Sequence, residues 1–371
     1  MAEQAADAPL RVSTLELFFD LVFAFTLTQL TALLAKHLSA AAIAQVLLVF
    51  GVLWWMYGGY AWLTNTRTPD RTPERALLLT GMAGFLIAGL AIPHGFGESG
   101  TGAGLALGLG YLIVVLVHAA LYARLNRNIL LLAPFNTASA LLVIGAGLTG
   151  GATGYVLWAA ALAVQVLSPL VANPGGRFHI QPAHFAERHG ALVIVALGES
   201  VAAVGIGAAG ARVTPSLISA IVLGLALSAG LWWTYFGTGD DAKGERAMTA
   251  AEPGQRPSLA LSAYFFAHIP ILLGVVVTAA GVTLTIGHAA EPHPAGQAVA
   301  LAAGVALFLA GHAWFRRILR TGPIAGRITA AAFALATSAV GVAVAIEAQL
   351  ALLLAAIVVM VAAERRQARP A

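Results

Sequence analysis

Two acidic residues lie in the first apolar stretch of the chain, at the start of a predicted membrane-spanning helix. Glu16 and Asp20 are four residues apart, so both carboxylates fall on one face of that helix. A carboxylate in an apolar segment costs about 2.5–3.5 kcal/mol on membrane-insertion scales, and it needs a partner or a wet cavity. We expect this pair to reach headgroups and water, to bridge to an arginine such as Arg11 or Arg124, or to form the mouth of a proton or cation pathway.

A third acid, Glu199, is predicted to lie deeper in the membrane. Counted from Arg188 at 1.5 Å per residue, it is about 16 Å along its helix, near the middle of a bilayer. Its neighbours Gly198 and Ser200 leave room for another backbone and supply a hydroxyl group. The position favours either a proton carrier or a hydrogen-bonded structural acid.

Three histidines and one amide in other apolar stretches complete the candidate pathway. They are His118, His268, His312 and Asn136. Imidazole titrates near neutral pH and can relay protons. Amides inside membranes most often form hydrogen bonds between helices. His118 and His312 stand close to basic residues at the ends of their helices, which favours packing roles for these two.

Charged residues also begin the predicted seventh span, at the cytoplasmic start of the second half. They are His184, Glu187 and Arg188. Their spacing approaches a zinc-protease pattern, but an arginine at the place of the second histidine would repel a metal ion. The chain has no cysteine, which excludes thiolate metal sites and disulfides. We expect no bound metal, no cofactor and no enzymatic activity.

The composition identifies an integral membrane protein that contacts the lipid bilayer. Of 371 residues, 59% are hydrophobic and 10% are charged, and the mean hydropathy is +0.85. Soluble domains carry about a quarter charged residues. The pI is near 9.7, but the basic residues lie between apolar stretches instead of forming one face. Nucleic-acid binding is therefore not expected.

About twelve apolar stretches are long enough to span a membrane, so the predicted fold is an all-α integral membrane protein. Polar, turn-rich breaks separate these stretches, and the segment from Gly237 to Pro257 is one of them. The predicted spans are 15–35, 41–63, 75–92, 103–124, 129–148, 152–171, 185–208, 215–237, 258–286, 297–315, 326–345 and 349–363.

The basic residues predict the orientation of these spans. If the termini and the even-numbered connections share one side, that side holds eighteen of the 20 lysines and arginines. Lys36 and Arg212 lie on the other side. The positive-inside rule then places both termini in the cytoplasm.

Three landmarks recur in the same order and suggest an internal repeat. Asp20 and Glu199 precede two similar segments at nearly the same distance, and these segments are Trp54-Trp55-Met56-Tyr57 and Trp232-Trp233-Thr234-Tyr235. The pairs His118-Ala119 and His312-Ala313 then follow. We expect two parallel six-helix halves, 15–173 and 174–363, between cytoplasmic tails 1–14 and 364–371. The alternative is a chance placement of Trp and His at membrane borders.

Two parts of the sequence resemble the signatures of the bacterial low temperature requirement protein A family. The first is Glu16-Leu17-Phe18-Phe19-Asp20-Leu21-Val22-Phe23, and the second combines Glu187-Arg188-His189-Gly190 with Leu197-Gly198-Glu199-Ser200. The resemblance extends from Arg11 to about Arg365. It implies a polytopic protein of the bacterial inner (plasma) membrane, in a family named for a growth phenotype in the cold, and it implies no molecular activity.

These observations leave three functions open, and the sequence does not set the oligomeric state. The leading hypothesis is proton-linked transport of an unidentified solute or ion, with Glu199 and Asp20 as the acids. The second is a cation channel, which needs a continuous polar pore. The third is a non-transporting membrane scaffold or stress-tolerance protein, in which every acid has a partner. A transporter is expected to gather Glu199, His268 and Asn136 around one cavity.

Overall fold

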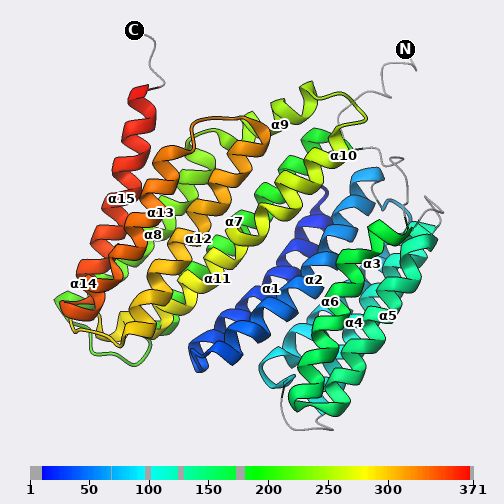
Figure 1. The fold of residues 1–371 in the computed structure, drawn as a ribbon, viewed down its shortest axis with the longest axis horizontal. Helices are drawn as coiled ribbons and strands as arrows, with labels where there is room; N and C mark the ends of the chain where they lie inside the picture. Colours follow the sequence, from blue (N-terminus) through cyan, green and yellow to red (C-terminus); the bar gives the residue numbers. More distant parts are fainter. Residues whose placement is uncertain (1–10, 68, 97–101, 124–128, 173–179, 368–371) are drawn as a thin grey trace. The chain divides into compact units, whose positions relative to one another are not determined.

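The computed structural model describes residues 11–67, 69–96, 102–123, 129–172 and 180–367 (Figure 1). In this part of the chain the regular structure is helical, without a β-strand. Twelve of the described helical segments are long and apolar enough to cross a membrane. The predicted fold class and the predicted number of spans are therefore confirmed.

The first six membrane-length helices follow the predicted spans closely. They are α1 (Thr14–Lys36), α2 (Ala40–Thr66), α3 (Thr72–Ala91), α4 (Gly102–Ala123), α5 (Ile129–Thr149) and α6 (Gly151–Ala172). Local sequence explains where these helices begin. Ser39 precedes α2, and its hydroxyl accepts a hydrogen bond from the Ala42 amide at 3.2 Å. Such a cap satisfies one of the free amides of the first turn.

The remaining membrane-length segments include two that depart from a simple α-helix. The helices are α7 (Pro182–Ala208), α8 (Pro215–Trp232), α11 (His268–Thr285), α12 (Ala295–Leu319), α13 (Ala325–Ala336), α14 (Ser338–Ala343) and α15 (Ile346–Gln367). π-Helical turns follow α8 at Trp233–Gly237 and precede α11 at Ala260–Phe266. π-Turns occur often at functional sites because they re-aim side chains within a helix.

The segment between these π-turns corrects one expectation. The sequence predicts a turn-rich connection from Gly237 to Pro257, but the structure contains α9 (Asp240–Ala250) and the short α10 (Arg256–Leu259) there. The residues of α9 are mostly good helix formers. Asp240 and Asp241 lie in its first turn, where negative charge complements the helix dipole.

The contacts divide the described chain into two compact units. The first contains the residues through 33 together with 39–188, and the second contains 34–38 together with the residues from 189 onward. In the first unit, α3 packs on α4 and α5 packs on both α4 and α6. In the second unit, α12 packs on α11 and α13, while α15 packs on α8. The duplication into halves 15–173 and 174–363 stays a prediction.

Aromatic side chains form the core of the first unit around one face of α1. Phe18 is 49% exposed, whereas Phe19 is 1% exposed, so the two adjacent rings point to opposite environments. The ring centroids of Phe19 and Tyr60 lie 4.9 Å apart, and those of Phe23 and Tyr57 lie 4.4 Å apart. This packing fixes the buried face of α1, which also carries Glu16 and Asp20.

Candidate functional site

Four buried ionisable side chains meet in the first unit, and we call them the acid–arginine cluster: Glu16 and Asp20 of α1, with His184 and Arg188 of α7. All four residues are fully buried. Arg188 Nη1 lies 3.3 Å from Glu16 Oε1, while its Nε and Nη2 each donate to Asp20 Oδ1 at 3.3 Å. One guanidinium therefore bridges two carboxylates that are one helical turn apart.

Both oxygens of Glu16 have partners. Oε2 accepts hydrogen bonds from the Ser13 amide at 2.9 Å and the Ser13 hydroxyl at 2.8 Å, and the same hydroxyl accepts from the Glu16 amide at 3.3 Å. This reciprocal arrangement is a capping box at the start of α1. Oε1 faces His184 and Arg188. Glu16 thus joins the first turn of α1 to α7.

Asp20 is bonded through only one of its oxygens. Its Oδ1 accepts from the Tyr57 hydroxyl at 2.9 Å and from Arg188. Its Oδ2 is buried and has no hydrogen-bond partner among the described residues. An ionised carboxylate accepts at both oxygens, so an unbonded buried oxygen is costly unless it carries a proton or contacts a cation.

The hydrogen bonds around His184 fix its tautomer. The Asn65 side-chain oxygen accepts from the Gln181 amide at 2.9 Å, so the Asn65 Nδ2 is the atom that faces His184 Nδ1, at 3.2 Å. An amide nitrogen can only donate, hence Nδ1 accepts and the ring proton lies on Nε2. Nε2 is 3.0 Å from Glu16 Oε1. His184 is therefore neutral in this arrangement.

The charges of the acid–arginine cluster do not balance. Two ionised carboxylates, one guanidinium and a neutral imidazole leave one negative charge in excess, and a proton on Asp20 removes it. The rings of Phe19 and Tyr57 lie 5.4 Å and 5.5 Å from the Arg188 guanidinium carbon, and Thr64 Oγ1 accepts from its Nη1. Because these rings exclude water, an uncompensated negative charge in the cluster destabilises the folded protein.

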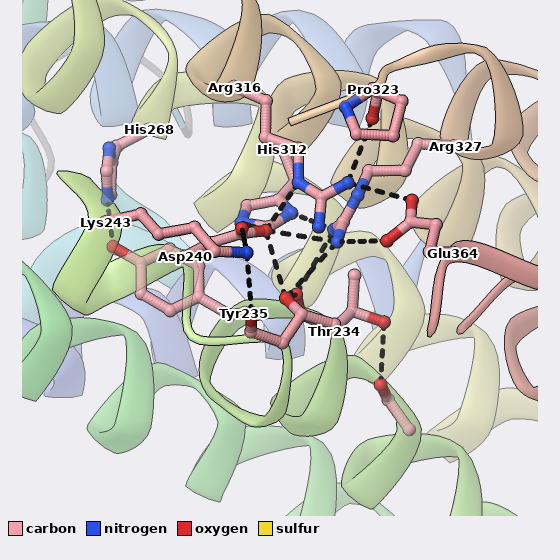
Figure 2. Close-up of polar contacts among 12 residues, drawn as sticks. Thr234, Tyr235, Asp240, Lys243, His268, His312, Arg316, Pro323, Arg327 and Glu364 are labelled. Atoms are coloured by element: carbon pink, nitrogen blue, oxygen red, sulfur yellow. Dashed lines mark hydrogen bonds and ion pairs between the residues drawn. The ribbon is translucent and has the colours of Figure 1, made fainter. Parts of the chain in front are cut away.

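A second group of charged residues lies in the second unit, and we call it the two-arginine cluster: the buried Asp240, Arg316 and Arg327 with the partly buried Glu364 (Figure 2). Arg316 donates to Asp240 Oδ2 at 2.5 Å and to Glu364 Oε1 at 2.9 Å. Arg327 donates to the same Asp240 oxygen at 3.1 Å and to Glu364 Oε2 at 3.2 Å. These two arginines and two acids join α9, α12, α13 and α15, and the partly exposed Lys243 ammonium lies 3.4 Å from Asp240 Oδ1.

Two of the predicted pathway histidines lie beside this second cluster. Arg327 donates to His312 Nδ1, which leaves the ring proton of His312 on Nε2. The side chain of His268 bonds to the Ala263 carbonyl through Nδ1 and to the Tyr235 hydroxyl through Nε2, each at 2.9 Å. Ala263 and Tyr235 belong to the two π-helical turns. The π-turns therefore set the orientation of His268.

The other predicted site residues are buried and are distributed over both units. In the first unit, Asn136 accepts from the Trp55 indole at 3.2 Å. His118 lies there between the rings of Tyr60 and Tyr122. Glu199 is buried in the part of α7 that belongs to the second unit. The roles of these residues in a proton pathway stay predictions.

The structure also identifies the basic partner of Asp20. The sequence suggested Arg11 or Arg124, but the arginine in contact is Arg188. Arg11 instead lies 3.9 Å from Glu187 at the protein surface, so Glu187 is turned away from the acid–arginine cluster. Arg124 lies outside the described residues.

Sequence reasoning overlooked several residues that the structure places in these clusters. Tyr57, Thr64 and Asn65 complete the first cluster, but they lie on α2, and spacing along the chain gives no sign of that contact. Asp240 lies in the segment that the sequence assigns to a connection, and no pattern in the sequence marks Glu364. In the part of the chain that the structure describes, no group of three or more His, Cys, Asp or Glu side chains could hold a metal ion.

Comparisons with known sequences identify the family of this chain. The family model of the bacterial low temperature requirement A protein (LtrA) matches residues 11–363. The chain belongs to this family. It is also 30% identical to uncharacterized protein RA0937 of Rhizobium meliloti over 320 residues, which are 82% of this chain and 76% of that protein. No solved structure matches the chain.

Family membership confirms the resemblance predicted from the sequence and gives the acid–arginine cluster its context. The segment with Glu16 and Asp20 and the segment with Arg188 are the two parts of the sequence that resemble LtrA signatures. In the fold these parts meet in one buried ionic contact. The protein is therefore a multi-pass membrane protein of a bacterial family, in which two distant sequence segments form one charged site.

Replacing Arg188 tests whether it holds two carboxylates in the core. Arg188→Gln leaves Glu16 and Asp20 buried without their shared cation, and breaking such a pair from one side costs about 3–5 kcal/mol. We expect the purified variant to have a clearly lower melting temperature than wild type, with unfolding monitored by tryptophan fluorescence. Glu187→Gln, at the adjacent surface position, should melt like wild type. Equal melting of both variants and wild type would show that the ionic bridge contributes nothing.

Replacing Asp240 tests the two-arginine cluster separately. Asp240→Asn leaves Arg316 and Arg327 facing Glu364 alone, so one buried positive charge is stranded at a cost of about 3–5 kcal/mol. Loss of the native fold should occur at a lower temperature than in wild type. The matched variant Asp241→Asn changes the next residue of α9, which lies outside the cluster, and should have little effect. A similar loss of stability in both variants would contradict the role given to Asp240.

Proposed function

We propose that the protein is a proton-linked transporter of a small solute or ion, and that Asp20 is its proton-binding acid. The observation that carries the proposal is the buried Oδ2 of Asp20, which has no hydrogen-bond partner among the described residues. The excess negative charge of the acid–arginine cluster supports it. A proton on this oxygen would neutralise the cluster without removing the bonds from Tyr57 and Arg188 to Oδ1.

The proposed cycle links the proton to the cargo through this charge. With Asp20 ionised, Arg188 is shared between two carboxylates. With Asp20 protonated, the guanidinium is opposed by one charge, and its bond to Asp20 weakens relative to its bond to Glu16. Any cargo whose affinity depends on the charge of the cluster is then thermodynamically linked to the proton, and each changes the affinity of the other by the same factor.

A small cavity next to Thr64 supports access of protons to the cluster. It has a volume of about 30 Å³ and lies at the end of α2, where its lining includes Thr64, Arg67 and Glu74. A cavity of this size can hold one water molecule that has polar partners. Arg67 and Glu74, which both line it, form an ion pair at 3.8 Å. Thr64 also accepts a hydrogen bond from Arg188. A single residue, Thr64, therefore connects the cavity to the acid–arginine cluster.

The two competing functions fit these contacts less well. A scaffold is expected to pair every buried acid, as the two-arginine cluster does, but Asp20 keeps an unbonded oxygen. A cation channel needs a continuous polar pore, whereas the aromatic rings of Phe19 and Tyr57 border Arg188. Glu199 is the second candidate acid of the cycle, supported by its burial in α7.

We infer that the protein works in the inner (plasma) membrane with both termini in the cytoplasm. The support is the distribution of eighteen of the 20 basic residues on one side of the predicted spans. In that orientation the cytoplasmic side holds the first turns of α1 and α7, together with the cavity beside Thr64. The cluster would then exchange its proton with the cytoplasm.

Proton movement in proteoliposomes tests the proposal. The vesicles would contain a trapped pH-sensitive dye, and the external probes would be sodium, potassium, a mixture of amino acids and a mixture of sugars. At least one probe should drive proton movement with wild-type protein. Asp20→Asn should reduce that movement at least tenfold, because asparagine keeps an oxygen for Tyr57 and Arg188 but cannot titrate.

The control variant is Glu187→Gln, which removes a nearby surface carboxylate and should transport like wild type. Asp20→Asn should keep a melting temperature close to that of wild type, since Arg188 still has Glu16 as its partner. Two results would contradict the proposal: no proton movement with any probe, or equal proton movement in wild type and Asp20→Asn.

A further inference from the structure

An apolar groove runs along the second unit between α8 and α15. Its volume is about 360 Å³, and Gly230, Leu354, Ile357 and Val361 are among the residues that line it. Leu354 and Arg365 mark its two ends on α15, which at 1.5 Å per residue are about 16 Å apart. This is about half of a 30 Å hydrocarbon core, the depth of one leaflet.

One end of this groove is basic and aromatic. Arg365 and Trp233 line that end, and the Arg365 guanidinium carbon lies 5.1 Å from the Trp233 ring centroid. Trp232 and Trp233 are 41% and 44% exposed. Exposed tryptophans of membrane proteins concentrate at the level of the lipid headgroups. The exposed Arg365 is thus at the depth where lipid phosphates lie.

The contacts of Arg365 leave it able to bind an anion. Its Nη2 lies 3.5 Å from the Gly237 carbonyl oxygen, and the tryptophan contact uses the face of the guanidinium. A guanidinium carries five N–H donors, and two of them can bind a phosphate side by side. The position therefore combines an orienting aromatic ring with free hydrogen-bonding capacity toward lipid.

A second groove in the same unit provides an internal comparison. It lies between α13 and α15, has a volume of about 430 Å³, and is lined by residues such as Ala330, Phe333, Ala356 and Met360. None of the residues that line this groove is charged. The two grooves share α15 and an apolar lining, but only the one between α8 and α15 has a cation at its end.

We propose that the groove between α8 and α15 binds one anionic phospholipid, with an acyl chain along the apolar lining and the headgroup phosphate on Arg365. The apolar length of the groove matches an acyl chain, the tryptophan matches the interfacial region, and Arg365 matches the headgroup phosphate. Basic sites between membrane helices bind anionic headgroups in this way. This inference does not depend on proton-linked transport, because it uses none of the residues of the acid–arginine cluster.

Native mass spectrometry of the delipidated, full-length protein tests this site with dioleoyl phosphatidylglycerol and dioleoyl phosphatidylcholine as probes. Wild type should bind one phosphatidylglycerol more tightly than phosphatidylcholine. Arg365→Gln should weaken phosphatidylglycerol about fivefold, the equivalent of about 1 kcal/mol for one basic residue at the membrane surface. Gly230→Leu, which fills the groove, should weaken both lipids.

Two matched variants make this result specific. Arg366→Gln removes the neighbouring exposed arginine. Ala356→Leu fills the second groove, between α13 and α15, which has no charged residue in its lining. Both variants should bind phosphatidylglycerol like wild type. Equal binding of the two lipids to wild type, or equal losses in Arg365→Gln and Arg366→Gln, would overturn the proposal. So would displacement of phosphatidylglycerol by equimolar inorganic phosphate, since that would identify a phosphate site without an acyl-chain requirement. Retained melting temperatures confirm that each variant is folded.

Discussion

The contact of Arg188 with Glu16 and Asp20 is the interaction on which the first unit depends. Buried carboxylates are tolerated inside membrane helices only with a partner, and one guanidinium serves both of these acids. The contact fixes the rotation of α1 about its axis, because the two acids are one turn apart on its buried face. The same rotation places Phe19 in the aromatic core and Phe18 outside it.

The two charged clusters of the protein obey the same physical constraint with different results. In the two-arginine cluster, two acids meet two arginines that join four helices, and Lys243 contacts the remaining Asp240 oxygen, so every carboxylate oxygen has a partner. In the acid–arginine cluster, two acids meet one arginine and a histidine whose hydrogen bonds keep it neutral. A network in which every carboxylate oxygen has a partner suits a permanent structural role. A cluster with an unbonded carboxylate oxygen leaves room for a proton.

The sequence was sufficient to predict the fold class and most of the spans, because runs of about twenty apolar residues have few alternatives to membrane helices. It also identified Glu16, Asp20 and Arg188 as unusual, since charges in such runs are costly. It could not predict that they meet. The contact between α1 and α7 joins residues more than 160 positions apart, and spacing along the chain gives no sign of such a contact.

The second cluster was missed for a related reason. Asp240 lies in a polar stretch that the sequence assigns to a connection, and α9 forms there because its helix-forming residues and first-turn acids outweigh the turn signals. Composition alone does not separate a polar connection from a short polar helix. Arg327 and Glu364 are likewise recognisable as partners only once α13 and α15 are packed against α12.

Infrared difference spectroscopy during a pH titration tests the central claim most directly, namely that the excess charge of the acid–arginine cluster is neutralised by a proton on Asp20. The purified wild-type protein should show the carbonyl stretch of a protonated carboxylic acid. Asp20→Asn should remove this band, whereas Glu187→Gln, which leaves both carboxylates of the cluster in place, should retain it. A band that persists in Asp20→Asn, or disappears in Glu187→Gln, would contradict the account.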